Sequence, residues 1–106
     1  MKKSLVIVLI IGLVIFFACK KEEKDTTPPV IALSGYNPTY VNLDSVYVEP
    51  GYTATDDVDG DISSEVVVTG TVDVHTEGKY ILYYNVSDKS GNAAEQQSRE
   101  VKVLKF

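Results

Sequence analysis

From Val30 onward the chain is a series of short runs of β-branched and aromatic residues, each ended by glycine, proline, aspartate or asparagine. Valine, isoleucine, threonine and tyrosine suit the pleated surface of a strand, and the residues between the runs favour turns. No long segment repeats its apolar residues at helical spacing. Short strands at roughly ten-residue spacing predict an all-β sandwich or barrel.

The runs predict extended segments at 30–33, 40–43, 46–48, 52–55, 65–72, 80–87 and 93–104. Residues 88–92, DKSGN, predict a tight hairpin loop in which Gly91 takes a positive φ. Alternation along the two longest segments gives each one apolar face, which we expect to line a core between two sheets. These faces carry Tyr80, Leu82, Tyr84 and Val86 on one segment and Val101 and Val103 on the other.

The segment Gly78-Lys79-Tyr80 has the pattern of a tyrosine corner, in which a tyrosine hydroxyl bonds to the backbone a few residues upstream. This hydroxyl is therefore expected to be structural. Together with the strand pattern, it favours a core between two packed sheets over residues 30–106.

An N-terminal export signal precedes this domain. The chain starts with MKK, and an uncharged apolar run follows from Leu5 to Ala18. The run is shorter than the roughly 20 residues of a transmembrane helix, so residues 1–18 are predicted to be a secretory signal peptide. Cys19, the only cysteine, follows the small residue Ala18, a spacing that resembles the lipobox of bacterial lipoproteins. The resemblance implies lipidation of Cys19, cleavage before it and a membrane anchor.

Two other interpretations of Cys19 stay open. One is ordinary secretion, with Cys19 removed or left as a free thiol, and the other is a retained signal anchor. A single cysteine excludes an intrachain disulfide in either case.

Residues 19–29 are predicted to be the lipidated cysteine and a charged linker, because KKEEKDTTPP shows no apolar periodicity. Its residues 21–25 resemble the acidic export signal of surface lipoproteins in some Bacteroidetes. That resemblance implies an outer-membrane lipoprotein exposed at the cell surface, and a periplasm-facing anchor is the alternative. The triplets DTT and DSV resemble a Bacteroidetes O-glycosylation sequon, so Thr26 and Ser45 are candidate glycosylation sites.

The charge balance argues against nucleic acid as a partner. The chain has fifteen acidic and ten basic residues, and two of the basic ones belong to the predicted signal peptide. The remaining sequence has no basic patch and no stripe of alternating basic and aromatic residues. We therefore expect no binding to nucleic acid and no electrostatic binding to anionic lipid. The expected partners are the membrane, through the lipid, and a protein or glycan ligand.

The densest acidic cluster is DDVDGD, residues 56–61. Two strand crossings separate this loop from the loop 88–92, so both loops are expected at the same end of the sandwich. Carboxylate and carbonyl oxygens are the ligands that calcium prefers, but the spacing does not fit an EF-hand. The alternative is that these side chains only cap local turns and that the protein has no cofactor. The candidate calcium ligands are Asp57, Asp59, Asp61 and Asp88, with Asn92 beside them.

No pattern in the chain indicates catalysis. His75 is the only histidine and is expected to be a solvated loop residue. A Ser-His-Asp site needs three groups in contact, and a zinc site needs more histidine or cysteine than the chain offers. We therefore expect that the protein is not an enzyme.

Some aromatic and apolar side chains lie outside the predicted core. Ile81 and Tyr83 lie on the face opposite the core residues of their strand, and Tyr36 and Tyr40 lie elsewhere in the chain. They are candidates for an exposed patch that binds a glycan or protein. Ordinary packing on the sheet is the alternative.

Several pieces of the sequence, in order, resemble a bacterial immunoglobulin-like domain of unknown function that is common in cell-surface proteins and similar to hyalin repeats. They are PPVI at position 28, GYTA at 51, DGDI at 59, GTVD at 70, GKY at 78 and DKSGN at 88. The resemblance implies an immunoglobulin-like β-sandwich of about six or seven antiparallel strands over residues 30–106. It also implies a role as a spacer, an adhesion module or a ligand-binding accessory. The sequence thus predicts a lipid-anchored envelope protein with a non-catalytic binding or spacer module. A structural subunit docked on an outer-membrane complex is the alternative.

Overall fold

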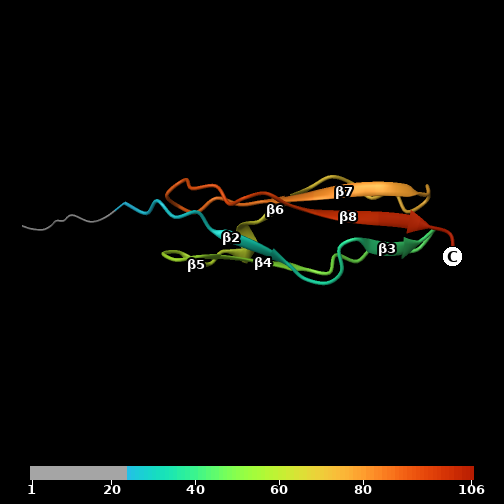
Figure 1. Ribbon diagram of the computed structural model, residues 1–106, viewed down its shortest axis with the longest axis horizontal. Helices are drawn as coiled ribbons and strands as arrows, with labels where there is room; N and C mark the ends of the chain where they lie inside the picture. Colours follow the sequence, from blue (N-terminus) through green and yellow to red (C-terminus); the bar gives the residue numbers. More distant parts are fainter. Residues whose placement is uncertain (1–23) are drawn as a thin grey trace, which may run out of the picture.

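The computed structural model describes residues 24–106, so the predicted signal peptide, Cys19 and the first part of the linker lie outside the described residues. Within this part of the chain, seven strands and one short 3-10 helix form a two-layered sandwich (Figure 1). No helix in this part is long and apolar enough to cross a membrane. The elements are β2 (Val30–Leu33), β3 (Thr39–Asn42), β4 (Tyr52–Asp56), β5 (Gly60–Asp61), the 3-10 helix η3 (Ser63–Glu65), β6 (Val67–Thr69), β7 (Gly78–Asn85) and β8 (Gln97–Leu104).

One sheet has the strand order β2-β4-β5, and the other has the order β3-β8-β7-β6. The predicted immunoglobulin-like β-sandwich is confirmed. The expectation of antiparallel pairing throughout is wrong for one pair, because β3 runs parallel to β8. Residues 34–38 carry the chain from the first sheet to the second without reversing it, so β3 keeps the direction of β2 and meets the last strand side by side (Figure 1).

The core lies between the sheets and contains the predicted faces of β7 and β8. Leu82 and Tyr84 are buried on β7, and Val101 and Val103 are completely buried on β8. The other sheet contributes Ile31 and Ala54. The predicted tyrosine corner is also present, since the Tyr80 hydroxyl donates a hydrogen bond to the backbone oxygen of Thr76 at 2.7 Å.

Two predicted strands differ from the structure. Residues 46–48 form no strand: Val46 and Val48 are exposed, while Tyr47 between them packs against the core. The segment predicted at 65–72 pairs only over β6, an edge strand whose three residues are all exposed. Both segments have strand-forming residues, but a strand also needs a partner, and these segments lie at the margin of the sandwich.

The hairpin between β7 and β8 forms around residues 88–92 as predicted, with Gly91 at φ +90°. The amide of Gly91 donates to the oxygen of Asp88, and the amide of Asp88 donates to the oxygen of Asn92. The hairpin is not regular throughout. Between the pairs Tyr84–Gln97 and Ser87–Ala93 the second strand has one residue more than the first, which is a β-bulge and ends the ladder early.

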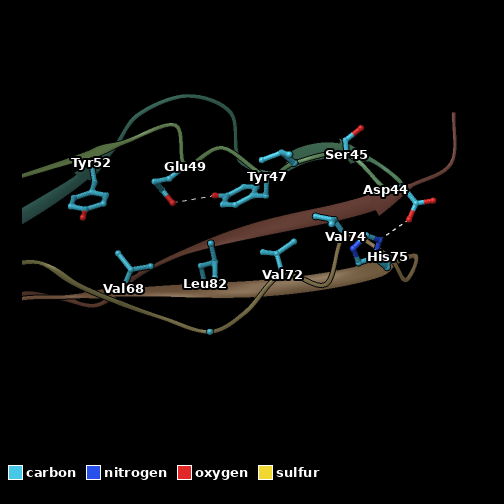
Figure 2. A pocket seen from close by; sticks show the side chains of 12 residues that line it. Asp44, Ser45, Tyr47, Glu49, Tyr52, Val68, Val72, Val74, His75 and Leu82 are labelled. Atoms are coloured by element: carbon cyan, nitrogen blue, oxygen red, sulfur yellow. Dashed lines mark hydrogen bonds and ion pairs between the residues drawn. The ribbon is translucent and has the colours of Figure 1, made fainter.

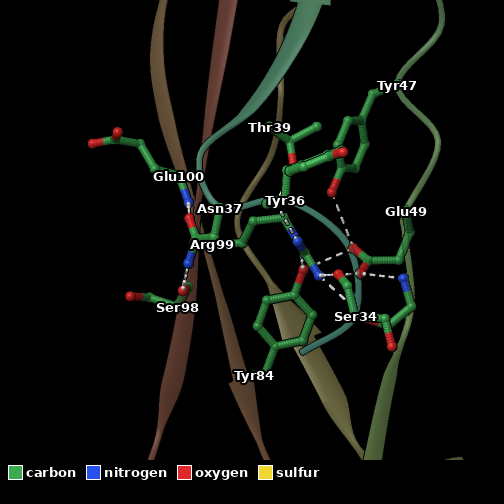
Figure 3. Close-up of polar contacts among 11 residues, drawn as sticks. Ser34, Tyr36, Asn37, Thr39, Tyr47, Glu49, Tyr84, Ser98, Arg99 and Glu100 are labelled. Carbon is green, nitrogen blue, oxygen red and sulfur yellow. Dashed lines mark hydrogen bonds and ion pairs between the residues drawn. The ribbon is translucent and has the colours of Figure 1, made fainter. Parts of the chain in front are cut away.

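A buried arginine joins the two layers (Figure 3). Arg99 lies on β8, the side chain is completely buried, and the guanidinium reaches the segments next to β2 and β4. Burial takes away the water that would otherwise accept from the guanidinium N–H groups, so these donors need acceptors within the protein. The guanidinium donates to the backbone oxygens of Ser34 (2.8 Å), Tyr36 (2.7 Å) and Gly51 (3.1 Å) and to the hydroxyl of Tyr84 (3.0 Å).

Glu49 supplies the opposite charge. Its Oε2 lies 3.4 Å from Nη2 of Arg99. Its Oε1 accepts hydrogen bonds from the hydroxyls of Tyr84 at 2.7 Å and Tyr47 at 3.1 Å. Burial and the Glu49 carboxylate raise the pKa of Tyr47. Burial also raises the pKa of Tyr84 and outweighs the lowering by the Arg99 hydrogen bond, so both phenols stay protonated and can donate.

The Tyr84 hydroxyl is expected to contribute strongly to stability, because it accepts from Arg99 and donates to Glu49. Tyr84→Phe removes both bonds and should lower the free energy of unfolding by roughly 1–3 kcal/mol. Tyr83→Phe is a matched control on the same strand. The Tyr83 ring is exposed, so removing its hydroxyl should change the free energy of unfolding by no more than about 0.5 kcal/mol. Urea unfolding followed by tyrosine fluorescence measures both. Equal midpoints for the two variants would contradict the proposed network.

Candidate functional site

An apolar cleft of about 670 Å³ lies between the segment that follows β3 and the side of the sandwich formed by β6 and β7 (Figure 2). Its polar groups gather on the segment 44–49 and at His75, which leaves most of the surface hydrophobic. The apolar lining is provided by Tyr47, Tyr52, Val68, Val72, Val74 and Leu82.

Two local features give the cleft its shape. The hydrogen bond from Tyr47 to Glu49, and the contact of Glu49 with Arg99, hold the segment 44–51 although it forms no strand. On the opposite wall Gly70 has φ +106°, and a Cβ there would lie 2.6 Å from the backbone oxygen of Ile81. Only glycine allows the chain after β6 to pass this close to β7.

A histidine and an aspartate pair at the rim of the cleft (Figure 2). Nδ1 of His75 lies 2.7 Å from Oδ1 of Asp44, and the two side chains are 75% and 67% exposed. The backbone supports this contact, because the amide of Asp44 donates to the oxygen of Val74. The hydrogen bond to Asp44 raises the pKa of His75. Among the described residues no hydroxyl group bonds to His75, so the pair resembles two members of a catalytic triad without a nucleophile.

Replacing Asp44 by asparagine should lower the pKa of His75 toward its ordinary value of about 6.5. The raised pKa means that the pair stabilises the fold at acidic pH, below about 6.5, and that this stabilisation is lost as pH rises through the folded-state value. The effect on stability should be small because both groups are exposed. An NMR titration of the His75 ring protons measures the shift, with Asp57→Asn as a charge-matched control. An unchanged titration in Asp44→Asn would show that the contact does not persist in solution.

The structure brings the two predicted acidic loops together: three of the four predicted calcium ligands, Asp59, Asp61 and Asp88, line one pocket between the loops, and Asp57 does not line it. Asp57 is exposed. Asp61 accepts hydrogen bonds from the amide and hydroxyl of Ser63, and these bonds lower its pKa. Asp59 accepts from the amide of Lys89 at 2.8 Å, which ties the loop after β4 to the loop after β7.

A different aspartate cluster forms at this end of the sandwich. Carboxylate oxygens of Asp25, Asp56 and Asp88 all lie within 4.8 Å of one another, so Asp88 is the only predicted ligand that takes part. Asp56 and Asp88 are each only 6% exposed. The side-chain amide of Asn92 connects the cluster, since it donates to a carboxylate oxygen of Asp88 and to the backbone oxygen of Asp25.

Neighbouring groups act in opposite directions on two of these carboxyls. The Thr27 amide lowers the pKa of Asp25, but desolvation and the adjacent Asp88 and Asp56 carboxylates outweigh it and raise the pKa. Desolvation raises the pKa of Asp88, but the hydrogen bonds from Asn92 outweigh it, and the pKa is lowered. The negative charge is therefore distributed unevenly within the cluster.

The other predicted site residues lie apart. Thr26 and Ser45, the candidate glycosylation sites, are both exposed. Tyr40 on β3 and Tyr83 on β7 are exposed but separated by β8, whose Lys102 lies over the Tyr40 ring at 5.9 Å. Tyr36 and Tyr40 line one pocket with Pro38 and Thr39, so the structure brings these two predicted residues together and leaves Tyr83 apart from them.

Residues 31–103 match the family described as bacterial surface protein, Ig-like domain. The chain belongs to this family. The match covers both sheets from β2 to β8, so the Ig-like domain accounts for the described fold. Family membership also identifies it as a module of bacterial surface proteins.

Two solved structures are similar to this Ig-like chain. A lipoprotein from Bacteroides thetaiotaomicron is 32% identical over 71% of this chain and 37% of that one, with a TM-score of 0.63. A structure of CBM51-2 in complex with GlcNAc and INT domains from Clostridium perfringens ZmpB is 28% identical, with a TM-score of 0.58. It covers 74% of this chain and 17% of that one. This Ig-like chain thus spans well under half of either structure. No curated protein shows significant similarity to it.

Proposed function

We propose that the protein is a lipid-anchored component of the outer membrane whose single Ig-like domain is a non-catalytic binding module facing the cell exterior. The observation that carries this proposal is the match to bacterial surface Ig-like domains over residues 31–103. The signal at Cys19 and the similar Bacteroides lipoprotein support the anchor. The apolar cleft favours binding over a role as a bare spacer, because a spacer needs no concave surface.

The chemistry of the cleft favours a protein ligand. Valine, leucine and tyrosine line it, and Val46 at its edge is 81% exposed. Apolar side chains of a partner would fill such a surface, whereas the hydroxyl groups of a sugar would need more hydrogen-bonding groups than the lining offers. Glu49 and the pair of His75 with Asp44 supply the few polar contacts that would orient the ligand.

A structural subunit of an outer-membrane complex is the second candidate. The observation that favours it is the position of β6 at the edge of its sheet, where no strand of the described residues pairs with its outer side. The three residues of β6 are also exposed. A partner strand could add to this edge. A stoichiometric membrane complex recovered after detergent extraction would support the subunit role.

The anchor predicts that Cys19 carries the lipid. In a Bacteroidetes host the protein should fractionate with the outer membrane, and its N-terminal peptide should begin at Cys19 with the mass of an acylated cysteine. Cys19→Ser should release the protein into soluble fractions. External protease on intact cells should digest the wild-type protein if it faces outward. A Cys19→Ser protein that remains in the membrane would contradict the anchor.

Binding in the cleft can be tested with two variants at its edge. Val46→Lys and Val68→Lys place a charge on the apolar surface and should weaken ligand binding at least tenfold, because lysine cannot be buried there unpaired. Val48→Lys is the matched control for Val46→Lys, since Val48 is also highly exposed in the same segment but does not line the cleft. Arrays of envelope proteins, host proteins and glycans provide the ligands. Equal binding by all three variants would exclude the cleft.

A further inference from the structure

Three aspartates from separate parts of the chain converge where the N-terminal segment meets the sandwich. Asp25 precedes β2, Asp56 is the last residue of β4, and Asp88 follows β7. Their carboxylate oxygens lie within 4.8 Å of one another, which is close enough to share one ligand. In Figure 1 this is the end of the molecule nearest the first described residues. Ionised carboxylates held this close repel one another unless one of them is protonated or a cation lies between them.

Two oxygens of the cluster are buried without a hydrogen-bond partner among the described residues. Oδ2 of Asp56 accepts hydrogen bonds from the amides of Val58 and Asp59, so capping of the turn explains that atom. Oδ1 of the same carboxylate is buried, and no group among the described residues donates to it. Asp56 is only 6% exposed, and Oδ2 of Asp25 is buried without a partner as well. Turn formation therefore leaves two oxygens of the cluster unexplained.

Within the described part of the chain, no basic side chain forms an ion pair with these carboxylates. The four ion pairs found within residues 24–106 involve Asp44, Glu49 and Glu100, and none involves a member of the cluster. Asn92 donates to Asp88 but brings no charge. An unpaired buried carboxylate is energetically expensive. A proton on one carboxyl would remove part of this cost, whereas a bound cation would balance the charge of all three carboxylates and give the two unpartnered oxygens a ligand to contact.

The ligand set favours one type of cation. The cluster offers oxygen atoms only and contains neither histidine nor cysteine, which argues against zinc. Magnesium is smaller, keeps several waters and usually takes one or two carboxylates, whereas calcium accepts several carboxylates in a flexible arrangement. We propose that Asp25, Asp56 and Asp88 bind a calcium ion that joins the N-terminal segment to the loops after β4 and β7.

The experiment uses the full-length protein purified in detergent and stripped of metal with a chelator. Calcium should bind with a stoichiometry of one in calorimetry and should raise the melting temperature by about 5 °C or more at saturation. It should also slow tryptic cleavage after Lys24, because the ion would hold the adjacent Asp25 against the domain. Magnesium at the same concentration should produce a much smaller effect.

Three variants locate the site. Asp56→Asn and Asp88→Asn should reduce calcium affinity at least tenfold and abolish the shift in melting temperature. Asp25→Asn should have the same effect, and it lies before the first strand, so loss of folding is not expected to mask the result. Asp57→Asn is the matched control, because it removes the same charge from an exposed neighbour outside the cluster.

Several outcomes would overturn the proposal. One is an unchanged melting temperature and no heat of binding with calcium up to about 5 mM, beyond the weakest common affinities. Another is loss of binding in Asp57→Asn with retention in Asp25→Asn and Asp56→Asn, which would assign the ion to the exposed loop. An equal response to magnesium would reject the assignment to calcium. None of these results bears on the cleft, so the two proposals fail separately.

Discussion

A completely buried guanidinium has to find an acceptor for nearly every donor, and the position of Arg99 makes the surrounding chain provide them. The backbone oxygens come from the segments beside β2 and β4, and the charge is balanced by Glu49. Glu49 in turn holds Tyr47. The stretch 44–51 has no strand pairing of its own, so its position depends on individual contacts. Backbone hydrogen bonds fix its two ends, at Asp44 and Gly51, and the contacts of Glu49 with Arg99 and Tyr47 hold the part between them, which forms one wall of the apolar cleft.

The parts of this fold that follow from local pattern could be predicted from the sequence. Alternation along β7 and β8 identified the buried faces, and the spacing around Tyr80 identified the tyrosine corner. The parallel pairing of β3 with β8 could not be predicted, because it depends on which sheet the chain joins after residue 38. The same applies to Arg99, whose partners Glu49 and Ser34 lie 50 and 65 residues away in sequence.

The acidic site shows a similar limit. The high density of acidic residues at 57–61 predicted the ligands there, but a run of acidic residues is as typical of a solvated turn as of a metal site. Asp56 carried a better signal, since it stands two residues after the buried Ala54 and therefore faces the same side of β4. Nothing near Asp25 in the sequence indicated that it would lie against Asp88, because the contact joins a predicted linker to a loop more than 60 residues later.

The cleft extends from His75, before β7, to Leu82 within that strand, whereas the aspartate cluster lies beyond the strand's C-terminal end. β7 begins just after His75, on the rim of the cleft, and ends just before Asp88 in the cluster. The strands run along the length of the molecule (Figure 1). Tension between an anchor before residue 24 and a ligand held in the cleft would therefore act parallel to β7 and β8. Their hydrogen bonds would share such a load in shear, whereas a pull across the sheet would open them one at a time.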